Sequence, residues 1–349
     1  MPGIARRPAS IASGSMQTPP QERRCQEWAR PPVSAILPAF NLAHKIGRTI
    51  EQLLRHDYPD LEIIVVDDGS SDGTADAVLR FPGVRLIRHP RNLGVSAARN
   101  TGIRAASHDL VYLLDADCTV LPGTVARLVQ RLVQDPRLGV VSGSYLSDRT
   151  KKNLANRVYD VAERFRDYQP GPRNYQYTTV SNAMLRRPVF ERVGGFGSTW
   201  RRIQDYEFTY RVHRAGYLVQ HDPSIKVVHD NHRETLRSYY SHVFLVARYG
   251  TVFRLMHRPA LPYSRYLVPS LPLFVLLSPL YFLMHTAKIF MESWRVGRIR
   301  SLIPVLPFVI WGRFIYTLGS VAGCAAYNRW NQPEPSRNRP AGIANQNQS

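Results

Sequence analysis

Short apolar runs alternate with amphipathic stretches from Val33 onward, which is typical of βαβ units around a parallel sheet. Apolar runs with the length of buried strands occupy residues 33–37, 61–66, 84–89 and 110–114. Stretches with the period of an α-helix occupy residues 45–56, 74–81, 92–106, 123–135 and about 205–216. We therefore expect an α/β fold with a mostly parallel, Rossmann-like sheet.

The hydropathy pattern changes after Tyr263. Residues 266–287 contain no Lys, Arg, Asp or Glu, and a run of this length can cross a bilayer. A second apolar run, 301–327, is interrupted by Arg313. We expect residues 251–328 to form membrane-associated helices with these two runs as candidate spans. Two alternatives remain open: buried helices of a soluble domain, and a re-entrant or in-plane arrangement.

Both ends of the chain differ in composition from its middle. Residues 1–31 are rich in Pro, Ser, Arg and Gln without periodicity, which predicts a disordered basic arm. We expect residues 329–349 to form a disordered tail. The three cysteines are odd in number and far apart, which favours a reducing compartment over a disulfide framework.

The formal net charge of +20 is compatible with nucleic acid or with an anionic membrane as a partner. Residues 231–300 hold ten Lys or Arg against two Glu, and this stretch adjoins the apolar runs. Basic residues beside an apolar segment favour contact with lipid headgroups. No zinc finger, RNP motif or basic zipper is present in the sequence, so we expect no nucleic-acid partner.

The apolar run at residues 110–114 stops at Asp115-Ala116-Asp117. On extended backbone, carboxylates two positions apart project from the same side. At the carboxyl end of a parallel strand they would face the crevice in which open α/β sheets bind ligands. Such a pair favours a divalent cation that carries phosphates. A polar turn that merely ends the strand is the alternative.

Several further motifs occur in a defined order, and together they resemble the glycosyltransferase family 2 enzymes with a GT-A nucleotide-sugar-binding fold. The resemblance runs from about Val33 to Gly250. The motifs are PAFN (38–41), VVDDGSSDGT (65–74), RNLGVSAARNTGI (91–103), the Asp115/Asp117 pair, VGGFG (193–197), QDYEFTYRVHRAGY (204–217) and VVHDNHRETL (227–236). The resemblance implies a catalytic domain at residues 32–250, with a nucleotide-sugar half at 32–148 and an acceptor half at 149–250.

The resemblance also implies how a nucleotide diphosphate sugar would be bound. Asp68 would accept a hydrogen bond from the base, with Pro38, Phe40 and Asn41 lining the base and ribose pocket. Arg99 can neutralise a phosphate from its helix, although an exposed helix residue is the alternative.

Asp115 and Asp117 correspond to the family's DXD-type motif. Asp117 would bind Mg²⁺ or Mn²⁺ directly, and Asp115 would reach the ribose or a metal-bound water. His229 is a possible third ligand, because imidazole suits Mn²⁺ better than Mg²⁺. His232 is a second candidate at the same segment. Purely structural histidines are the alternative.

Asp205 matches the aspartate of the family's Glu-Asp motif and would act as the catalytic base. A carboxylate there can take the proton of an acceptor hydroxyl, with inversion at the anomeric carbon. The alternative is a carboxylate that complements the helix dipole. Gln204 replaces the usual acidic partner, which puts the tuning of the base in doubt. Glu207 is the fallback candidate.

These expectations combine into an inverting, metal-dependent transferase at the cytoplasmic face of a membrane. It would move a single sugar to a hydroxyl of a lipid or a lipid-linked glycan. Arg329-Trp330 is the only piece comparable to the Gln-x-x-Arg-Trp element of processive synthases, with Ala326 where the Gln would be. A processive polysaccharide synthase and a non-catalytic nucleotide-sugar-binding subunit remain as alternatives.

Overall fold

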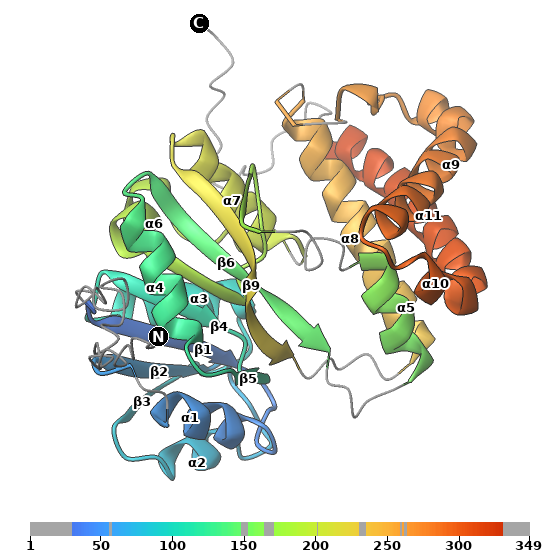
Figure 1. The fold of residues 1–349 in the computed structure, drawn as a ribbon. Helices are drawn as coiled ribbons and strands as arrows, with labels where there is room; N and C mark the ends of the chain where they lie inside the picture. Colours follow the sequence, from blue (N-terminus) through green and yellow to red (C-terminus); the bar gives the residue numbers. More distant parts are fainter. Residues whose placement is uncertain are drawn as a thin grey trace, which may run out of the picture.

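The computed structural model describes residues 30–55, 58–147, 153–163, 171–200, 202–229, 235–258, 260–261 and 264–330. Most of the expected arm and tail lies outside these ranges, as does His232. The described chain forms an α/β domain and, beside it, a group of helices (Figure 1).

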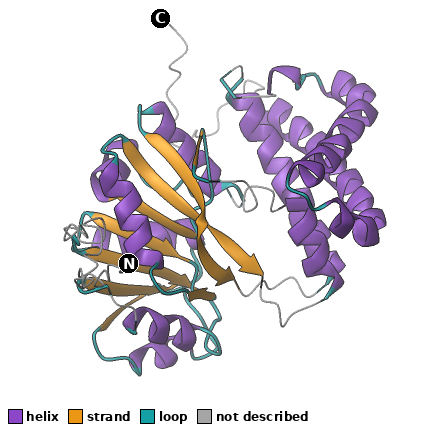
Figure 2. Ribbon diagram, viewed as in Figure 1, coloured by secondary structure: helices purple, strands orange, loops and turns teal. Residues whose placement is uncertain are grey.

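A mixed sheet with the order β3-β2-β1-β4-β8-β6-β9-β5 forms the centre of the α/β domain, and β7 pairs with β9 (Figure 2). The strands are β1 Val33–Ala39, β2 Leu61–Asp67, β3 Val84–Arg88, β4 Leu110–Leu114, β5 Cys118–Val120, β6 Leu138–Ser147, β7 Arg173–Tyr175, β8 Asn182–Arg186 and β9 Leu218–His229. The first four are mutually parallel, whereas β8 runs antiparallel between β4 and β6. The sheet predicted from the alternating pattern is confirmed.

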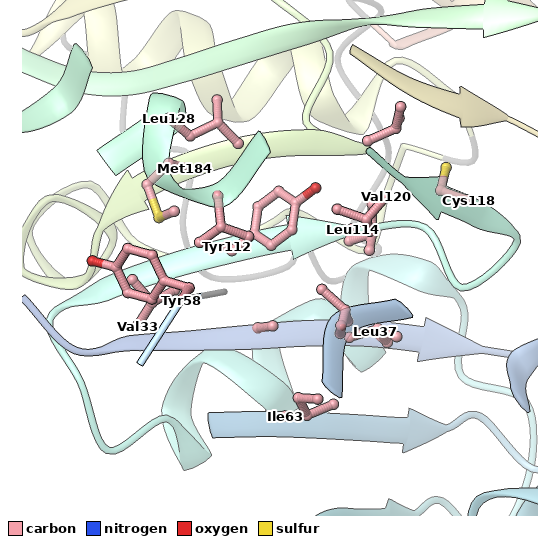
Figure 3. Close-up of a cluster of buried hydrophobic side chains, with 14 of the residues drawn as sticks. Val33, Leu37, Tyr58, Ile63, Tyr112, Leu114, Cys118, Val120, Leu128 and Met184 are labelled. Atoms are coloured by element: carbon pink, nitrogen blue, oxygen red, sulfur yellow. The ribbon is translucent and has the colours of Figure 1, made fainter. Parts of the chain in front are cut away.

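Both faces of β1, β2 and β4 are buried, because helices cover each of them. One face packs on α1 Ile46–Leu54, α2 Thr74–Leu79 and α4 Thr124–Gln134. The other packs on α3 Val95–Ala105, α6 Arg187–Val193 and α7 Gln204–Arg214. Along β1, Ala35 and Leu37 point into the first cluster and Ile36 into the second. Figure 3 shows part of the first cluster, where Tyr112 and Leu114 of β4 lie close to Val120 of β5.

Helices from two distant parts of the sequence form the second group, which we call the helical lobe. Its members are α5 Leu154–Glu163, α8 Leu236–Met256, α9 Leu271–Arg295, α10 Ile299–Leu302 and α11 Leu306–Trp330, with short 3₁₀ turns at Ser264–Tyr266 and Ile303–Val305. The expected boundary at residues 250/251 falls within α8. The helical lobe therefore begins earlier than the hydropathy pattern indicated, because α8 presents one apolar stripe to α11 without being apolar all round.

Close contact between α8 and α11 depends on glycine. A Cβ atom at Gly319 or Gly323 would lie 2.4 Å from the carbonyl oxygen of Phe244 or Arg248. This small-xxx-small spacing lets two helix backbones approach closely. The segments Leu271–Arg295 and Ile299–Arg329 are each long and apolar enough to cross a membrane, judged by length and composition.

Candidate active site

A cavity of about 1280 Å³ opens at the carboxyl ends of β1, β2 and β4. Those three strands are adjacent in the sheet, so the polar residues that follow them meet at one edge. Eight of the residues singled out from the sequence line this cavity: Pro38, Phe40, Asp68, Arg99, Asp115, Asp117, Asp205 and His229.

Asp115 and Asp117 lie on a tight turn between β4 and β5. The expectation of extended backbone was wrong, because the amide of Cys118 donates to the carbonyl of Asp115 at 3.0 Å and closes the turn. Pairing of β5 with β9 then sets Cys118 opposite His229. As a result, Oδ1 of Asp117 lies 3.3 Å from Nε2 of His229. The two carboxylates therefore have different neighbours.

The donor atoms of Asp117, Cys118 and His229 lie within 4.8 Å of one another. A carboxylate oxygen and an imidazole nitrogen suit Mn²⁺, whereas a thiolate is a soft ligand that favours other metals. The Cys118 side chain belongs to the apolar core beneath the turn. The residues present therefore fit a divalent cation held by Asp117 and His229. Asp115 is not part of this group.

Arg99 of α3 lines the cavity but is largely buried, with 4% of its side chain exposed. Its Nη1 donates to Oδ1 of Asp205 at 2.5 Å, and its Nη2 donates to Oδ1 of Asp115 at 3.1 Å. Burial alone would lower the pKa of Arg99, but the charges of Asp205 and Asp115 outweigh burial and raise it. We expected Arg99 either to contact a donor phosphate or to be an exposed helix residue. It is buried instead, and both of its terminal nitrogens contact carboxylates.

Asp205 lies in the first turn of α7. Its Oδ2 accepts from the amide of Val180 at 3.1 Å, so each carboxylate oxygen has a donor. Ile203, the N-cap residue immediately before α7, has a φ of 60°. This is a strained conformation for a β-branched side chain. Strain of this kind is retained where the surrounding structure fixes a functional segment.

Glu207, the fallback base, is not among the cavity residues. Its carboxylate pairs with Arg211 through Nε at 2.6 Å and Nη2 at 3.0 Å. The same guanidinium donates to the carbonyls of Val193, Gly194 and Gly195. Glu207 therefore orients the side chain that holds the glycine turn.

Asp68 is 3% exposed and accepts three hydrogen bonds within the protein. Its donors are Nδ1 of His89 at 2.7 Å and the amides of Leu93 and Gly94 at 3.0 and 2.7 Å. These contacts fix the loop that leads into α3 at the cavity wall. We expected the Asp68 carboxylate to accept a hydrogen bond from the nucleotide base. Most of its hydrogen-bond acceptor sites are instead used by donors within the protein.

Asn41 does not line the cavity, in contrast to the expectation. Its backbone amide donates to Oγ of Ser70 at 2.9 Å, and its side-chain Oδ1 accepts from the backbone amide of Ser71 at 3.1 Å. With a φ of 53°, Asn41 adopts a left-handed conformation that Asn tolerates better than most residues. Its contacts connect the end of β1 to the loop that follows β2.

Other cavity residues were not identified from the sequence. They are chiefly Tyr145, Ser181, Trp200 and side chains of α5 and α8. Ser181 precedes β8, and its carbonyl accepts from the amide of Asp115 at 3.0 Å. These positions come from antiparallel and helix packing that the motif order does not encode.

The family model described as Glycosyl transferase family 2 matches residues 34–194. The chain contains a glycosyltransferase family 2 domain. Asp205 and His229 lie beyond the part of this family domain that the model matches.

Two curated relatives illustrate the similarity. Probable glycosyltransferase YdaM of Bacillus subtilis is 29% identical over 222 residues, covering 58% of this chain and 53% of the relative. Pre-mycofactocin glycosyltransferase of Mycobacterium tuberculosis is 29% identical over 215 residues, covering 59% and 44%. The chain thus spans about half the length of these relatives.

A solved mannosyltransferase from Pyrobaculum calidifontis, in complex with GDP-Man and Mn²⁺, superposes with a TM-score of 0.55. The match has 21% identity and covers 87% of this chain and 88% of that one. It shows that the glycosyltransferase family 2 domain of this protein has the GT-A fold.

Proposed function

We propose that the protein is an inverting, metal-dependent glycosyltransferase. It transfers one sugar from a nucleotide diphosphate sugar to a hydroxyl of a lipid or a lipid-linked glycan. The observation that carries this proposal is the single cavity that Asp117, His229 and Asp205 share. A cation site and a carboxylate base in one cavity are the two requirements of this reaction.

The donor end of the cavity is the edge formed by Pro38, Phe40 and Asp68. Asp117 and His229 would hold Mg²⁺ or Mn²⁺ there, with Asp115 beside them. A bound divalent cation would supply Lewis-acid neutralisation of the diphosphate charge. The GDP-Man and Mn²⁺ bound by the Pyrobaculum protein of the same fold support this arrangement.

Asp205 accepts the proton of the acceptor hydroxyl in the proposed reaction. As that oxygen bonds to the anomeric carbon, the bond from this carbon to the diphosphate oxygen breaks, and the nucleoside diphosphate leaves with the electron pair. Attack from the face opposite the leaving group inverts the configuration. Arg99 donates to the Asp205 carboxylate at 2.5 Å and orients it.

The helical lobe would attach the enzyme to the cytoplasmic face of the cell membrane. On α9, large apolar side chains such as Leu276 and Leu283 are 73% and 61% exposed. Apolar surface of this extent favours contact with a membrane over contact with water. Arg313 of α11 does not oppose this assignment, because Glu163 of α5 pairs with it.

The test is a thermal-shift screen of nucleotide diphosphate sugars with and without Mn²⁺. Binding to the folded state raises the unfolding temperature, so the donor is the sugar nucleotide that stabilises the protein only with the cation. Purified enzyme with that donor should then release nucleoside diphosphate. If donor binds and no turnover occurs in native membranes, the protein is a binding subunit. If polymer forms at limiting enzyme, it is a processive synthase.

A further inference from the structure

The cavity has a second wall, formed by the helical lobe. Tyr159 and Glu163 of α5 and His242, Leu245 and Val246 of α8 line it. Figure 1 shows α5 and α8 on the side of the helical lobe that faces the α/β domain. Small-molecule sites typically occupy about 300 to 1,000 Å³. A cavity of about 1280 Å³ therefore has room for a second substrate beside the donor.

α8 presents two different stripes of side chains. Tyr239, Val243 and Ala247 are buried in the cluster that joins α8 to α11 and α5. Leu245 and Val246 face the cavity and are only half-buried. Leu245 and Val246 of α8 therefore give the cavity an apolar patch at the wall formed by the helical lobe.

This second wall is held rigidly in place. Glu163 accepts a hydrogen bond from the buried Arg313 of α11, and Tyr239 of α8 donates to Glu163 at 3.4 Å. Further along α8, Phe253 packs edge-on against Trp200 at 6.1 Å between ring centroids. Trp200 itself lines the cavity close to the start of α7. The apolar patch and Asp205 are thus positioned by one connected structure.

We propose that the α5/α8 wall is the acceptor subsite and that it binds an amphipathic acceptor. The apolar part of that molecule lies against Leu245 and Val246, and its polar, hydroxyl-bearing head reaches Asp205 past Trp200. This inference rests on the proposed function and adds the place where the acceptor binds. The acceptor oxygen bonds to the anomeric carbon, its proton passes to Asp205, and the diphosphate departs with the electrons of the broken bond.

Two features support this assignment. Asp68, Asp115 and Asp117 gather at the sheet edge, where a phosphorylated donor with its cation fits, which leaves the α5/α8 end for the other substrate. The apolar residues of that end stand on α8, which packs directly on the apolar helix α11. An acceptor that emerges from a membrane at the helical lobe therefore meets this wall before it meets the base.

The experiment compares two activities of the same full-length enzyme with labelled donor and Mn²⁺. The first is hydrolysis of the donor by purified protein, which needs no acceptor. The second is transfer of label to chloroform–methanol-extractable material in membranes of the native host. The variant is Leu245→Ser/Val246→Ser, and the matched control is Leu79→Ser/Val133→Ser, which removes exposed Leu and Val side chains from α2 and α4.

We expect the α8 variant to lower transfer at least tenfold and to leave donor hydrolysis within twofold of wild type, while the control changes neither. Val246→Trp, which fills the subsite instead of emptying it, should give the same split if the double variant is poorly folded. Unchanged transfer, or transfer and hydrolysis that fall together, would overturn the subsite. Label found only in water-soluble product would overturn the amphipathic acceptor. Absence of both donor binding and hydrolysis in wild type would instead contradict the proposed function.

Discussion

The buried Arg99 and the partly exposed Asp205 form an ion pair at 2.5 Å, and the other terminal nitrogen of Arg99 reaches Asp115 at 3.1 Å. One cation thus joins the proposed base to the turn that carries the proposed metal ligand, although 106 residues separate Arg99 from Asp205 in the sequence. We infer that this contact orients both carboxylates before the substrates bind.

Replacing Arg99 with Gln should lower turnover roughly 10- to 100-fold, because a charge-assisted hydrogen bond contributes about 1.5 to 3 kcal/mol. Arg99→Lys retains the charge but not the two-pronged geometry, so it should recover only part of the rate. The measurement is kcat and KM for the donor, together with the unfolding temperature of each variant. If the Gln and Lys variants are as stable as wild type and turn over at the wild-type rate, Arg99 does not orient the two carboxylates.

Asp117→Asn and His229→Ala should each weaken Mn²⁺ binding at least tenfold, because the proposed site then loses one of its two ligands. Titration calorimetry with Mn²⁺ alone measures this directly, without a donor. Asp76→Asn, an exposed carboxylate on α2, is the matched control and should bind Mn²⁺ like wild type. Unaltered affinity in both site variants would place the cation elsewhere.

Removal of Glu163 should destabilise the helical lobe. Glu163→Gln leaves Arg313 buried without its counter-charge, and losses of this kind cost about 3 to 5 kcal/mol. The double variant Glu163→Gln/Arg313→Met should regain part of the loss, since no uncompensated charge remains. The measurement is the unfolding midpoint of wild type, Glu163→Gln and the double variant, all in the same detergent. A double variant less stable than Glu163→Gln would contradict this explanation.

Leu276→Ser/Leu283→Ser should reduce binding to vesicles of phosphatidylcholine and phosphatidylglycerol at least tenfold. Burial of one leucine side chain contributes about 1.5 to 3 kcal/mol, and both side chains are largely exposed on α9. Flotation of protein with vesicles provides the readout, with Leu79→Ser on α2 as the control. If the doubly substituted protein floats with vesicles as wild type does, this face of α9 does not enter the lipid.

The sequence was informative where a residue's role depends on its immediate neighbours. Strands β1, β2 and β4 are largely apolar because helices cover both of their faces, and the runs of β2 and β4 are followed by the cavity residues Asp68 and Asp115. The short strands β5 and β7 depend on pairing with the distant β9, which no local pattern indicates.

The partners of the site side chains could not be predicted from the sequence either, because they also come from distant parts of the chain. Nothing near Arg99 in the sequence indicates that Asp205 and Asp115 occupy its guanidinium, and nothing near Asp68 indicates that His89 uses its carboxylate. The contribution of α5 to the cavity depends on Glu163 meeting Arg313, which lies 150 residues away. Motif order identified which residues gather at the cavity, and tertiary packing determines what each one contacts.

The most direct test of the account is transfer by Asp205→Asn in a single-turnover assay with bound donor and Mn²⁺. Asn keeps the shape of the side chain but cannot accept the acceptor proton, and loss of a general base typically costs 10²- to 10⁴-fold in rate. We predict donor affinity within about threefold of wild type, with transfer reduced by at least 100-fold. Transfer at the wild-type rate would contradict the assignment of Asp205 as the base.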